Sequence, residues 1–249
     1  MALDEALLLT FDPHRSLPIL RLYGWEPAAL SLGRFQDAAA VLDLARCRSA
    51  GIPLVRRITG GGVIYHGDEL TYSIICAPHH LPPDSSIKES FRYLTAFLLL
   101  FYGKLGLAPH YAAEISQAQH LGRRTPFCFA GQESYDILLE GKKIGGNAQR
   151  RLKEVIFQHG SIPLLNRAEE GGTFMREPPE GIGAETFSLC QAGIREDEVT
   201  LKSLLAESFQ EGMGVLLREE RLTTQEEEKS EELRVKYRDD GWNLRGETA

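Results

Sequence analysis

The sequence lacks the features that mark several large classes of protein. Its four cysteines form no CxxC pair, which argues against a disulfide scaffold or a zinc knuckle and suits a reducing cytoplasm. The longest apolar run, residues 93–102, is too short to span a bilayer, so we expect no membrane association. The first residues show no basic stretch followed by an apolar core, so we expect no secretory signal and a cytoplasmic location.

Positive charge is also scarce. The formal net charge is −7, which argues against a nucleic-acid partner. The charge is uneven, because residues 195–249 are strongly acidic while residues 121–153 carry seven basic and three acidic side chains. A basic surface on an acidic protein steers acidic partners, but an ordinary solvated face with scattered lysines has the same composition.

Helix and strand patterns interleave along the chain, and no internal repeat or low-complexity segment is present. Helical periodicity or capping signals occur at 1–9, at 37–51, from Ser86, at 201–213 and from Thr223. Strand patterns occur at 18–25, 53–59, 71–77, 135–140, from Lys143 and at 155–165. A hairpin around Gly141 favours an α+β fold in which a central, mixed, mostly antiparallel sheet is flanked by helices. We expect one domain over 1–249, with a helical, acidic C-terminal segment from about 195.

The stretch "RRITGGGVIYH" at 56–66 places three consecutive glycines after two arginines. Glycine costs conformational entropy, so such a run suits a place where side chains would block the backbone. The run lies between two predicted strands and matches neither a P-loop nor GxGxxG, which argues against an ordinary nucleotide-binding fold. A loop with exposed N–H groups beside arginines suits an anion or a polarised carbonyl. A glycine-rich hairpin loop with surface arginines is the structural alternative.

A second candidate site lies in "PFCFAGQESYDILLEGKKIGGNAQRR" at 126–151. Cys128 falls in a long irregular stretch, about 106–134, and loops of that length in compact domains are often functional. Lys142 and Lys143 follow a turn, and a hairpin is able to bring one of them back beside Cys128. A lysine ammonium nearby favours the thiolate, the nucleophilic form of cysteine. A lone cysteine is nevertheless more often an inert small residue.

Several motifs, taken in order, resemble the lipoate–protein ligase and octanoyltransferase family. They are "LSLGRFQ" (30–36), "GIPLVRRITGGGVIYH" (51–66), "ELTYSII" (69–75), "EGKKIGGNAQRR" (140–151) and "FQHGSIPL" (157–164). The end of the chain, "KYRDDGWNLR" (236–245), is similar to the end of the transferases of that family. The resemblance covers residues 2 to about 245. It implies the catalytic fold of that family, which is related to the biotin ligases and class II synthetases.

The family contains more than one chemistry. Its ligases activate lipoate with ATP and Mg, whereas the octanoyltransferases that this chain resembles take octanoyl from acyl carrier protein and need no cofactor. The stretch "GDELTYS" after His66 is similar to the transferases, while "GGG" at 60–62 is typical of ligases. The resemblance favours an octanoyltransferase of protein lipoylation. An ATP-dependent lipoate ligase, an amidotransferase that moves octanoyl between lipoyl domains, and a non-catalytic protein that binds lipoyl cargo remain as alternatives.

The resemblance also implies a role for each site residue. Cys128 accepts the octanoyl group, and Lys143 favours the thiolate and polarises the acyl carbonyl. The residues implied to bind the substrate are Arg57, Gly60, Gly61, Gly62, His66, Gly145, Gly146, Asn147 and Ala148. His66 and His159 also suit ordinary structural roles. The implied donor is octanoyl-acyl carrier protein, and the acceptor is a lipoyl domain of the glycine cleavage H protein or of a 2-oxoacid dehydrogenase E2. No metal site is implied.

Overall fold

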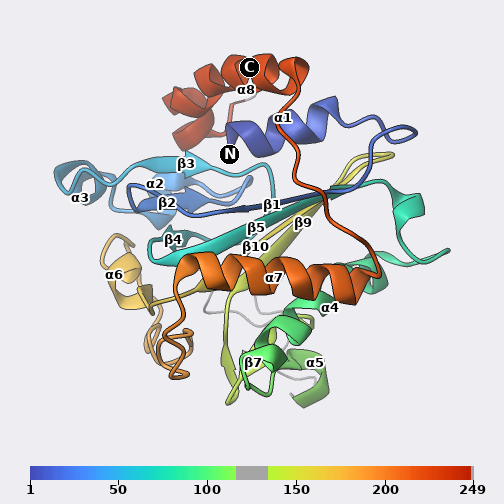
Figure 1. Ribbon diagram of the computed structural model, residues 1–249. Coiled ribbons are helices and arrows are strands. Elements are labelled where there is room, and N and C mark those ends of the chain that lie inside the picture. The colour runs from blue at the N-terminus through green and yellow to red at the C-terminus, as the bar shows by residue number, and fades with distance from the viewer. Residues whose placement is uncertain (116–133, 248–249) are drawn as a thin grey trace.

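A four-stranded antiparallel sheet runs through the middle of the molecule, with helices above and below it (Figure 1). The computed structural model describes residues 1–115 and 134–247. The strand order of the central sheet is β1 (Ile19–Tyr23), β5 (Glu69–Cys76), β10 (Ile156–Pro163) and β9 (Gly146–Arg151). Every neighbouring pair in it is antiparallel. The predicted α+β fold with a mostly antiparallel central sheet is confirmed.

Helices cover both faces of this sheet. They are α1 (Ala2–Thr10) and α8 (Thr224–Arg238) on one face, and α4 (Ile87–Lys104) and α7 (Glu198–Met213) on the other. Successive side chains of a strand point to opposite faces, so β5 feeds two hydrophobic cores. Tyr72 and Ile74 pack with α4 and α7. Ile75 packs with α1 and with Trp242 near the C-terminus. All eight residues of β5 are buried, and they include three polar ones, Glu69, Thr71 and Ser73.

A second sheet holds the glycine run. Its strand order is β3 (Leu54–Arg56), β2 (Ala29–Leu32) and β4 (Ile64–His66), and it is mixed, because β2 pairs in parallel with β3 and antiparallel with β4. The short helices α2 (Ala38–Val41), α3 (Leu44–Ser49) and α6 (Ala168–Gly172) contribute to its separate hydrophobic core. Strand β4 was not predicted. It places residues 60–62 in the connection between β3 and β4.

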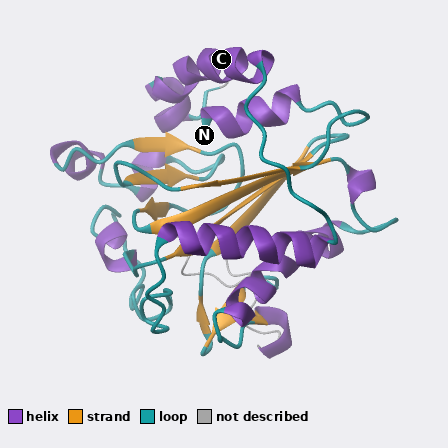
Figure 2. Cartoon of the chain, in the orientation of Figure 1, coloured by secondary structure: helices purple, strands orange, loops and turns teal. Residues whose placement is uncertain are grey.

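A small third sheet lies apart from the central one (Figure 2). It consists of β6 (His110–Tyr111), β7 (Ile137–Leu139) and β8 (Lys142–Lys143), and the short helix α5 (Ala112–Ile115) follows β6. Strands β7 and β8 form the predicted hairpin, and both turn residues, Glu140 and Gly141, have positive φ. The hairpin places Lys143 close to the start of β9.

The single helix predicted over 37–51 is wrong. Asp37 caps α2, Leu42 is extended, and Asp43 then caps α3 by accepting hydrogen bonds from two backbone N–H groups. A second aspartate at cap spacing offers the backbone a new helix start, so the chain makes two short helices. The predicted stop at Gly51 is confirmed, and its φ of +66° is the left-handed conformation of a helix end.

Both predicted capping boxes are present, at Ser86 before α4 and at Thr223 before α8. The helical periodicity after Ser86 predicts Ile87 on the same apolar face as Leu94 and Leu98, and this prediction is wrong, because Ile87 is 64% exposed. Ile87 is the first residue of the helix and lies beyond the core that buries Leu94, Leu98 and Phe101.

The two ends of the described chain lie together, because α8 packs along α1 (Figure 1). Lys236 Nζ lies 2.7 Å from both carboxylate oxygens of Glu5, and the Tyr237 hydroxyl donates to the same carboxylate at 2.8 Å.

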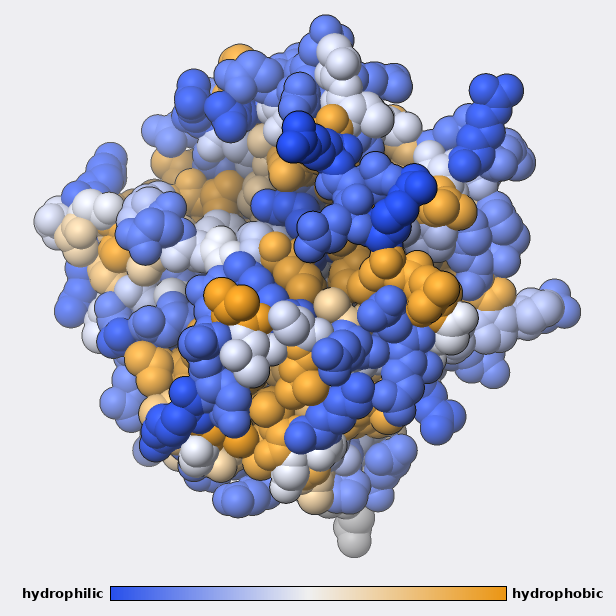
Figure 3. Space-filling view, viewed as in Figure 1, coloured by the Kyte–Doolittle hydropathy of each residue, from blue (hydrophilic) through white to orange (hydrophobic). Residues whose placement is uncertain are grey.

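Leu216, in the connection between α7 and α8, is 93% exposed. Figure 3 shows apolar side chains among the polar surface on this face. Across the described segments, each helix is too short or too polar to serve as a bilayer span.

Candidate active site

The glycine run packs against another segment of backbone. A Cβ on Gly33 would lie 1.9 Å from the carbonyl oxygen of Gly61, so the two loops approach more closely than a side chain permits. Gly61 has a φ of +99°, which favours glycine. A Cβ on Gly60 would meet no atom within 4 Å. The run therefore makes a tight backbone contact on one side and leaves room on the other.

Arg57 holds the glycine run from inside the protein. Its side chain is buried, and its guanidinium donates to the carbonyl oxygens of Gly60 at 3.2 Å and Gly62 at 2.8 Å. It also donates to the hydroxyl of Ser31 at 2.6 Å and to the carbonyl of Ser31 at 2.9 Å. The alternative of a loop flanked by surface arginines is therefore wrong.

Arg56, the last residue of β3, binds a different set of groups from Arg57, which follows the strand. Its buried guanidinium donates to backbone carbonyls of Gly33, Arg34, Gln36, Trp242 and Leu244. The side-chain oxygen of Asn243 accepts from the Arg56 N–H at 3.0 Å. Arg56 thus joins the end of the chain to the loop that packs against the glycine run.

His66 lies in the middle of a buried chain of hydrogen bonds. Its Nε2 is 2.6 Å from the hydroxyl oxygen of Ser31, and its Nδ1 is 2.6 Å from a carboxylate oxygen of Glu69. The indole of Trp25 stacks on the imidazole with 3.9 Å between ring centroids and 11° between planes. Both nitrogens and one face of the ring therefore contact protein groups.

Glu69, the first residue of β5, is the buried carboxylate of this cluster. It accepts from His66, from the Thr71 hydroxyl at 2.7 Å and from the Ser161 hydroxyl at 2.5 Å. Burial alone would raise the pKa of this carboxyl, but His66 and the hydroxyl donors outweigh it and hold the pKa below its ordinary value. Glu69 is therefore ionised at neutral pH.

His159, on β10, is the second buried histidine of the site. Its Nε2 is 2.7 Å from the hydroxyl oxygen of Thr59, which precedes the glycine run. Burial, and then the charge of Arg57, lower the pKa of His159 to about 3. The ring is therefore neutral at physiological pH. Its contact with Thr59 ties β10 to the loop that carries the glycines.

Arg57, His66 and His159 line the same pocket. Its lining residues are Trp25, Arg57, Ile64, His66, Thr71, Gly146, Asn147, Ala148, His159, Gly160 and Ser161. Five of the residues predicted to bind substrate are among them: Arg57, His66, Gly146, Asn147 and Ala148. Gly60, Gly61, Gly62 and Gly145 do not line it. Gly60 and Gly62 act on the pocket through their hydrogen bonds to Arg57.

The motif "GGNA" at 145–148 is held by close backbone contacts. Gly145 has a φ of +99°, and a Cβ there would lie 2.2 Å from the carbonyl oxygen of Ser161. A Cβ on Gly160 would lie 2.1 Å from the side-chain oxygen of Asn147. That oxygen accepts from the Tyr72 hydroxyl at 2.7 Å. Both glycines allow β9 and β10 to meet at the pocket wall.

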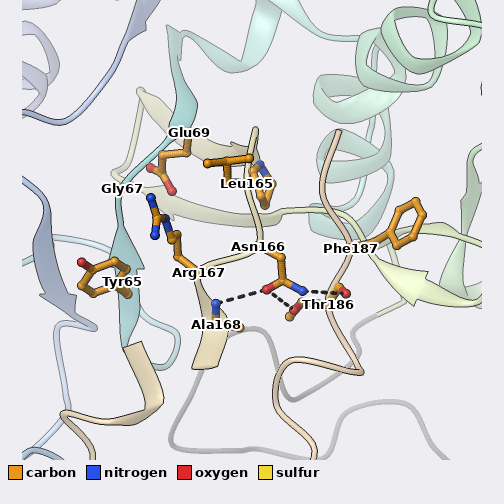
Figure 4. A pocket seen from close by; sticks show the side chains of 10 residues that line it. Tyr65, Gly67, Glu69, Leu165, Asn166, Arg167, Ala168, Thr186 and Phe187 are labelled. Atoms are coloured by element: carbon orange, nitrogen blue, oxygen red, sulfur yellow. Dashed lines mark hydrogen bonds between the residues drawn. The ribbon is translucent and has the colours of Figure 1, made fainter. Parts of the chain in front are cut away.

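A second pocket lies on the other side of Glu69 (Figure 4). Figure 4 shows Asn166 near its centre: its side-chain oxygen accepts from the Ala168 N–H at 3.1 Å and from the Thr186 hydroxyl at 2.9 Å. Arg167 also lines this pocket, and its guanidinium pairs with Asp68. These polar groups hold the turn before α6 in place.

Lys143 is buried and forms an ion pair. Its Nζ lies 2.7 Å from a carboxylate oxygen of Asp136, and both side chains are 3% exposed. Lys142 is exposed, so the two lysines point to opposite faces of β8, as the strand pattern predicts. Cys128, the predicted nucleophile, lies outside the described residues.

The basic surface predicted over 121–153 is smaller than expected. Lys143 is buried, and Arg150 is half-buried, where it donates to the carbonyl of Ile58 at 3.1 Å. Lys142, Arg151 and Lys153 are exposed. Arg123 and Arg124 lie outside the described residues.

Comparison with known proteins identifies the family. The model of the lipoyl protein ligase A/B catalytic domain matches residues 1–209. This chain belongs to that family. Octanoyltransferase LipM of Kyrpidia tusciae is 34% identical over 98% of this chain and 93% of its own length. Octanoyltransferase LipM of Bacillus subtilis is 30% identical over 98% of this chain and 93% of its own.

Solved structures of the family share the fold. A crystal structure of lipoate-protein ligase A bound with ATP matches with a TM-score of 0.82 and 24% identity, over 98% of this chain and 92% of its own. A bi-partite lipoate protein ligase from Thermoplasma acidophilum matches with a TM-score of 0.80 and 24% identity, over 100% of this chain and 91% of its own. The predicted lipoate ligase fold is thereby confirmed.

In this member of the lipoyl ligase family, the polar site residues that the sequence analysis did not predict include Ser31, Glu69 and Asp136. Ser31 and Asp136 sit among apolar neighbours, and nothing local marks their partners. Glu69 carried a signal, since a glutamate that opens the buried run "ELTYSIIC" needs a hydrogen-bonding partner, and His66 is three residues away.

Proposed function

We propose that this chain moves an octanoyl group from acyl carrier protein to the lysine of a lipoyl domain, through a thioester on Cys128. The observation that carries this proposal is the relatedness to octanoyltransferases LipM, at 30–34% identity over nearly the whole chain. The enzyme is an acyltransferase of protein lipoylation.

The first half-reaction forms the acyl-enzyme. The Cys128 thiolate attacks the thioester carbonyl of the donor, the carbon–sulfur bond to the carrier breaks, and the carrier leaves as a thiol after taking up a proton. The thioester is already activated, so we propose that no nucleotide takes part. Lys143 stabilises the negative charge that develops on sulfur and on the carbonyl oxygen. Asp136 fixes the ammonium of Lys143 in the buried site.

The second half-reaction forms the product amide. The neutral amine of the acceptor lysine attacks the acyl-enzyme, the new carbon–nitrogen bond forms, and Cys128 leaves as a thiolate. A proton is lost from the attacking nitrogen. The pocket beside Arg57 and His66 holds the acyl group, and apolar contact contributes about 0.8 kcal/mol for each buried CH₂.

The two carriers would use the same face of the enzyme in turn. The bi-partite ligase from Thermoplasma acidophilum was studied with its E2 lipoyl domain, which makes a lipoyl domain the natural acceptor to test here. Lys142, Arg151 and Lys153 are exposed cations on this part of the chain and are able to steer acidic carriers. Transfer should slow as salt is raised, because salt screens such exposed charges.

The deciding experiment is incubation of the purified protein with octanoyl-acyl carrier protein and no nucleotide, followed by intact-protein mass spectrometry. We expect the mass of one octanoyl group, released by hydroxylamine, and transfer to an apo lipoyl domain added afterwards. Cys128→Ser should abolish both, because a serine hydroxyl is not ionised at neutral pH. Modification of the lipoyl domain by free lipoate or octanoate with ATP, but not by octanoyl-acyl carrier protein, would establish a ligase instead. Transfer only from an octanoylated lipoyl domain would establish an amidotransferase.

A further inference from the structure

A continuous chain of hydrogen bonds joins Arg57 to Glu69 behind the pocket. Arg57 Nη1 donates to the Ser31 hydroxyl oxygen at 2.6 Å, that oxygen is 2.6 Å from His66 Nε2, and His66 Nδ1 is 2.6 Å from Glu69. All four side chains are buried. One end of the chain is a cation that only donates, and the other is a carboxylate that, when ionised, only accepts.

The fixed ends set the direction of every bond between them. Ser31 accepts from Arg57, and His66 donates from Nδ1 to Glu69. Among the described residues, the Ser31 hydroxyl oxygen contacts only Arg57 and His66. The Ser31 hydroxyl, which accepts from Arg57, then directs its own hydrogen at His66 Nε2, so each of the three contacts in the chain has one donor and one acceptor. The negative charge of Glu69 is consequently available to balance the positive charge of Arg57.

Glu69 lies behind the pocket wall and does not line the pocket. Two residues stand between Glu69 and the pocket. Thr71 and Ser161 both line the pocket, and the hydroxyl of each donates to the Glu69 carboxylate. Both carboxylate oxygens are occupied by protein donors, so Glu69 acts through its charge and its neighbours. The other ionisable groups on the wall are Arg57, His66 and His159. Burial keeps His159 neutral, as its lowered pKa shows.

We propose that Glu69 is a specificity-determining, positioning residue: through His66 and Ser31 it balances the charge of Arg57, so that the pocket takes the neutral acyl thioester and does not favour a free fatty carboxylate. This inference rests on the proposed function, because it takes the pocket as the acyl site. A buried guanidinium whose charge is not balanced attracts carboxylates strongly. With Glu69 ionised, a second carboxylate near Arg57 meets repulsion as well as attraction.

The test compares two ligands of one shape, octanoate and octanamide, by calorimetric titration of the full-length protein without carriers. In the wild type, octanoate should bind no more than about threefold better than octanamide. Glu69→Gln keeps the shape of the side chain and removes its charge, so the octanoate-to-octanamide affinity ratio should rise by about tenfold or more. General damage to the pocket would weaken both ligands and leave the ratio unchanged.

The matched control is Asp68→Asn, which removes an equal charge one residue away. Asp68 is exposed and pairs with Arg167, so water screens it and the ratio should stay within about twofold of the wild type. An unchanged ratio in a folded Glu69→Gln variant would overturn the proposal. If that variant does not fold, the wild-type ratio decides: a preference for octanoate above about tenfold would mean that Arg57 is not balanced. Failure of octanoyl transfer in the wild type, with these ratios as expected, would reject the proposed function alone.

Discussion

The ammonium of Lys143 lies 2.7 Å from the carboxylate of Asp136, and both side chains are 3% exposed. Buried pairs of this kind gain little over a well-packed apolar pair, but breaking one leaves a charge in a low-dielectric environment. We therefore expect changes to this ion pair to affect the stability of the β7–β8 hairpin and the reactivity of Cys128, the proposed acyl acceptor.

Asp136→Asn should lower the free energy of unfolding by about 3 kcal/mol, the usual cost of removing one partner of a buried ion pair. Urea unfolding at pH 7 measures this value. Lys142→Ala is the matched control, because Lys142 is the exposed neighbour on the same strand, and its effect should stay within about 0.5 kcal/mol. Equal losses in the two variants would contradict a buried ion pair that matters to the fold.

Lys143→Ala should slow acylation by octanoyl-acyl carrier protein by about 100-fold, the usual scale for removing one acid–base or electrostatic group. The rate is followed by intact mass, and the thiol reactivity by alkylation with iodoacetamide across pH. The double variant Asp136→Asn with Lys143→Met removes both buried charges and should recover most of the stability. It should remain slow in acylation. Recovery of acylation in the double variant would mean that Lys143 has only a structural role.

The features that could be predicted from the sequence are those that depend on residues close together along the chain. The capping boxes at Ser86 and Thr223 depend on residues three apart, so they hold whatever the rest of the chain does. The hairpin at Gly141 and the opposite faces of Lys142 and Lys143 follow from local geometry in the same way. The break at Asp43 is also local, but a helical pattern through 37–51 obscured a second cap.

The parts of the site that were not predicted depend on contacts between distant residues. Ser31 meets His66 across 35 positions, and Glu69 meets Ser161 across 92. The buried state of Arg56 depends on carbonyls at 242 and 244, which only the folded chain brings near. The sequence shows that the two arginines precede the glycine loop. It does not show that they are buried, because their burial depends on the tertiary structure.

Gly33→Ala should destabilise the protein strongly, because its Cβ would lie 1.9 Å from the Gly61 carbonyl oxygen and the backbone of one loop would have to move. We expect a loss of at least about 3 kcal/mol, in the range seen for severe steric strain in a packed region. Gly60→Ala is the paired control within the same contact region. Its Cβ meets no atom within 4 Å, so the change should stay within about 1 kcal/mol. Thermal and urea unfolding decide the matter, and a reversed order of the two variants would refute the close approach.

His159 should make the protein less stable in mild acid. Burial, followed by the charge of Arg57, lowers its pKa from 6.5 to about 3. Between these values the unfolded chain binds a proton that the folded chain does not, so the free energy of unfolding falls as pH falls. The slope is about 1.4 kcal/mol per pH unit below the unfolded value, and the contribution is flat above it.

Between pH 6.5 and 5 the Met1 amino group and His80, whose pKa values burial also lowers, contribute to the slope as well, so the comparison of variants isolates His159. Asp4 and Glu69 have lowered pKa values, so the stability they contribute is present above their ordinary values of 3.8 and 4.5 and is lost only as pH falls further. Urea unfolding at several pH values in the window should give a shallower slope for His159→Gln than for the wild type, by about 1 kcal/mol per unit. His14→Gln is the control, since His14 is exposed and should leave the slope unchanged. If His159→Gln retains the full wild-type slope, the imidazole of His159 is not held neutral by burial, and the hydrogen bond to Thr59 has to be reconsidered as that of a protonated ring.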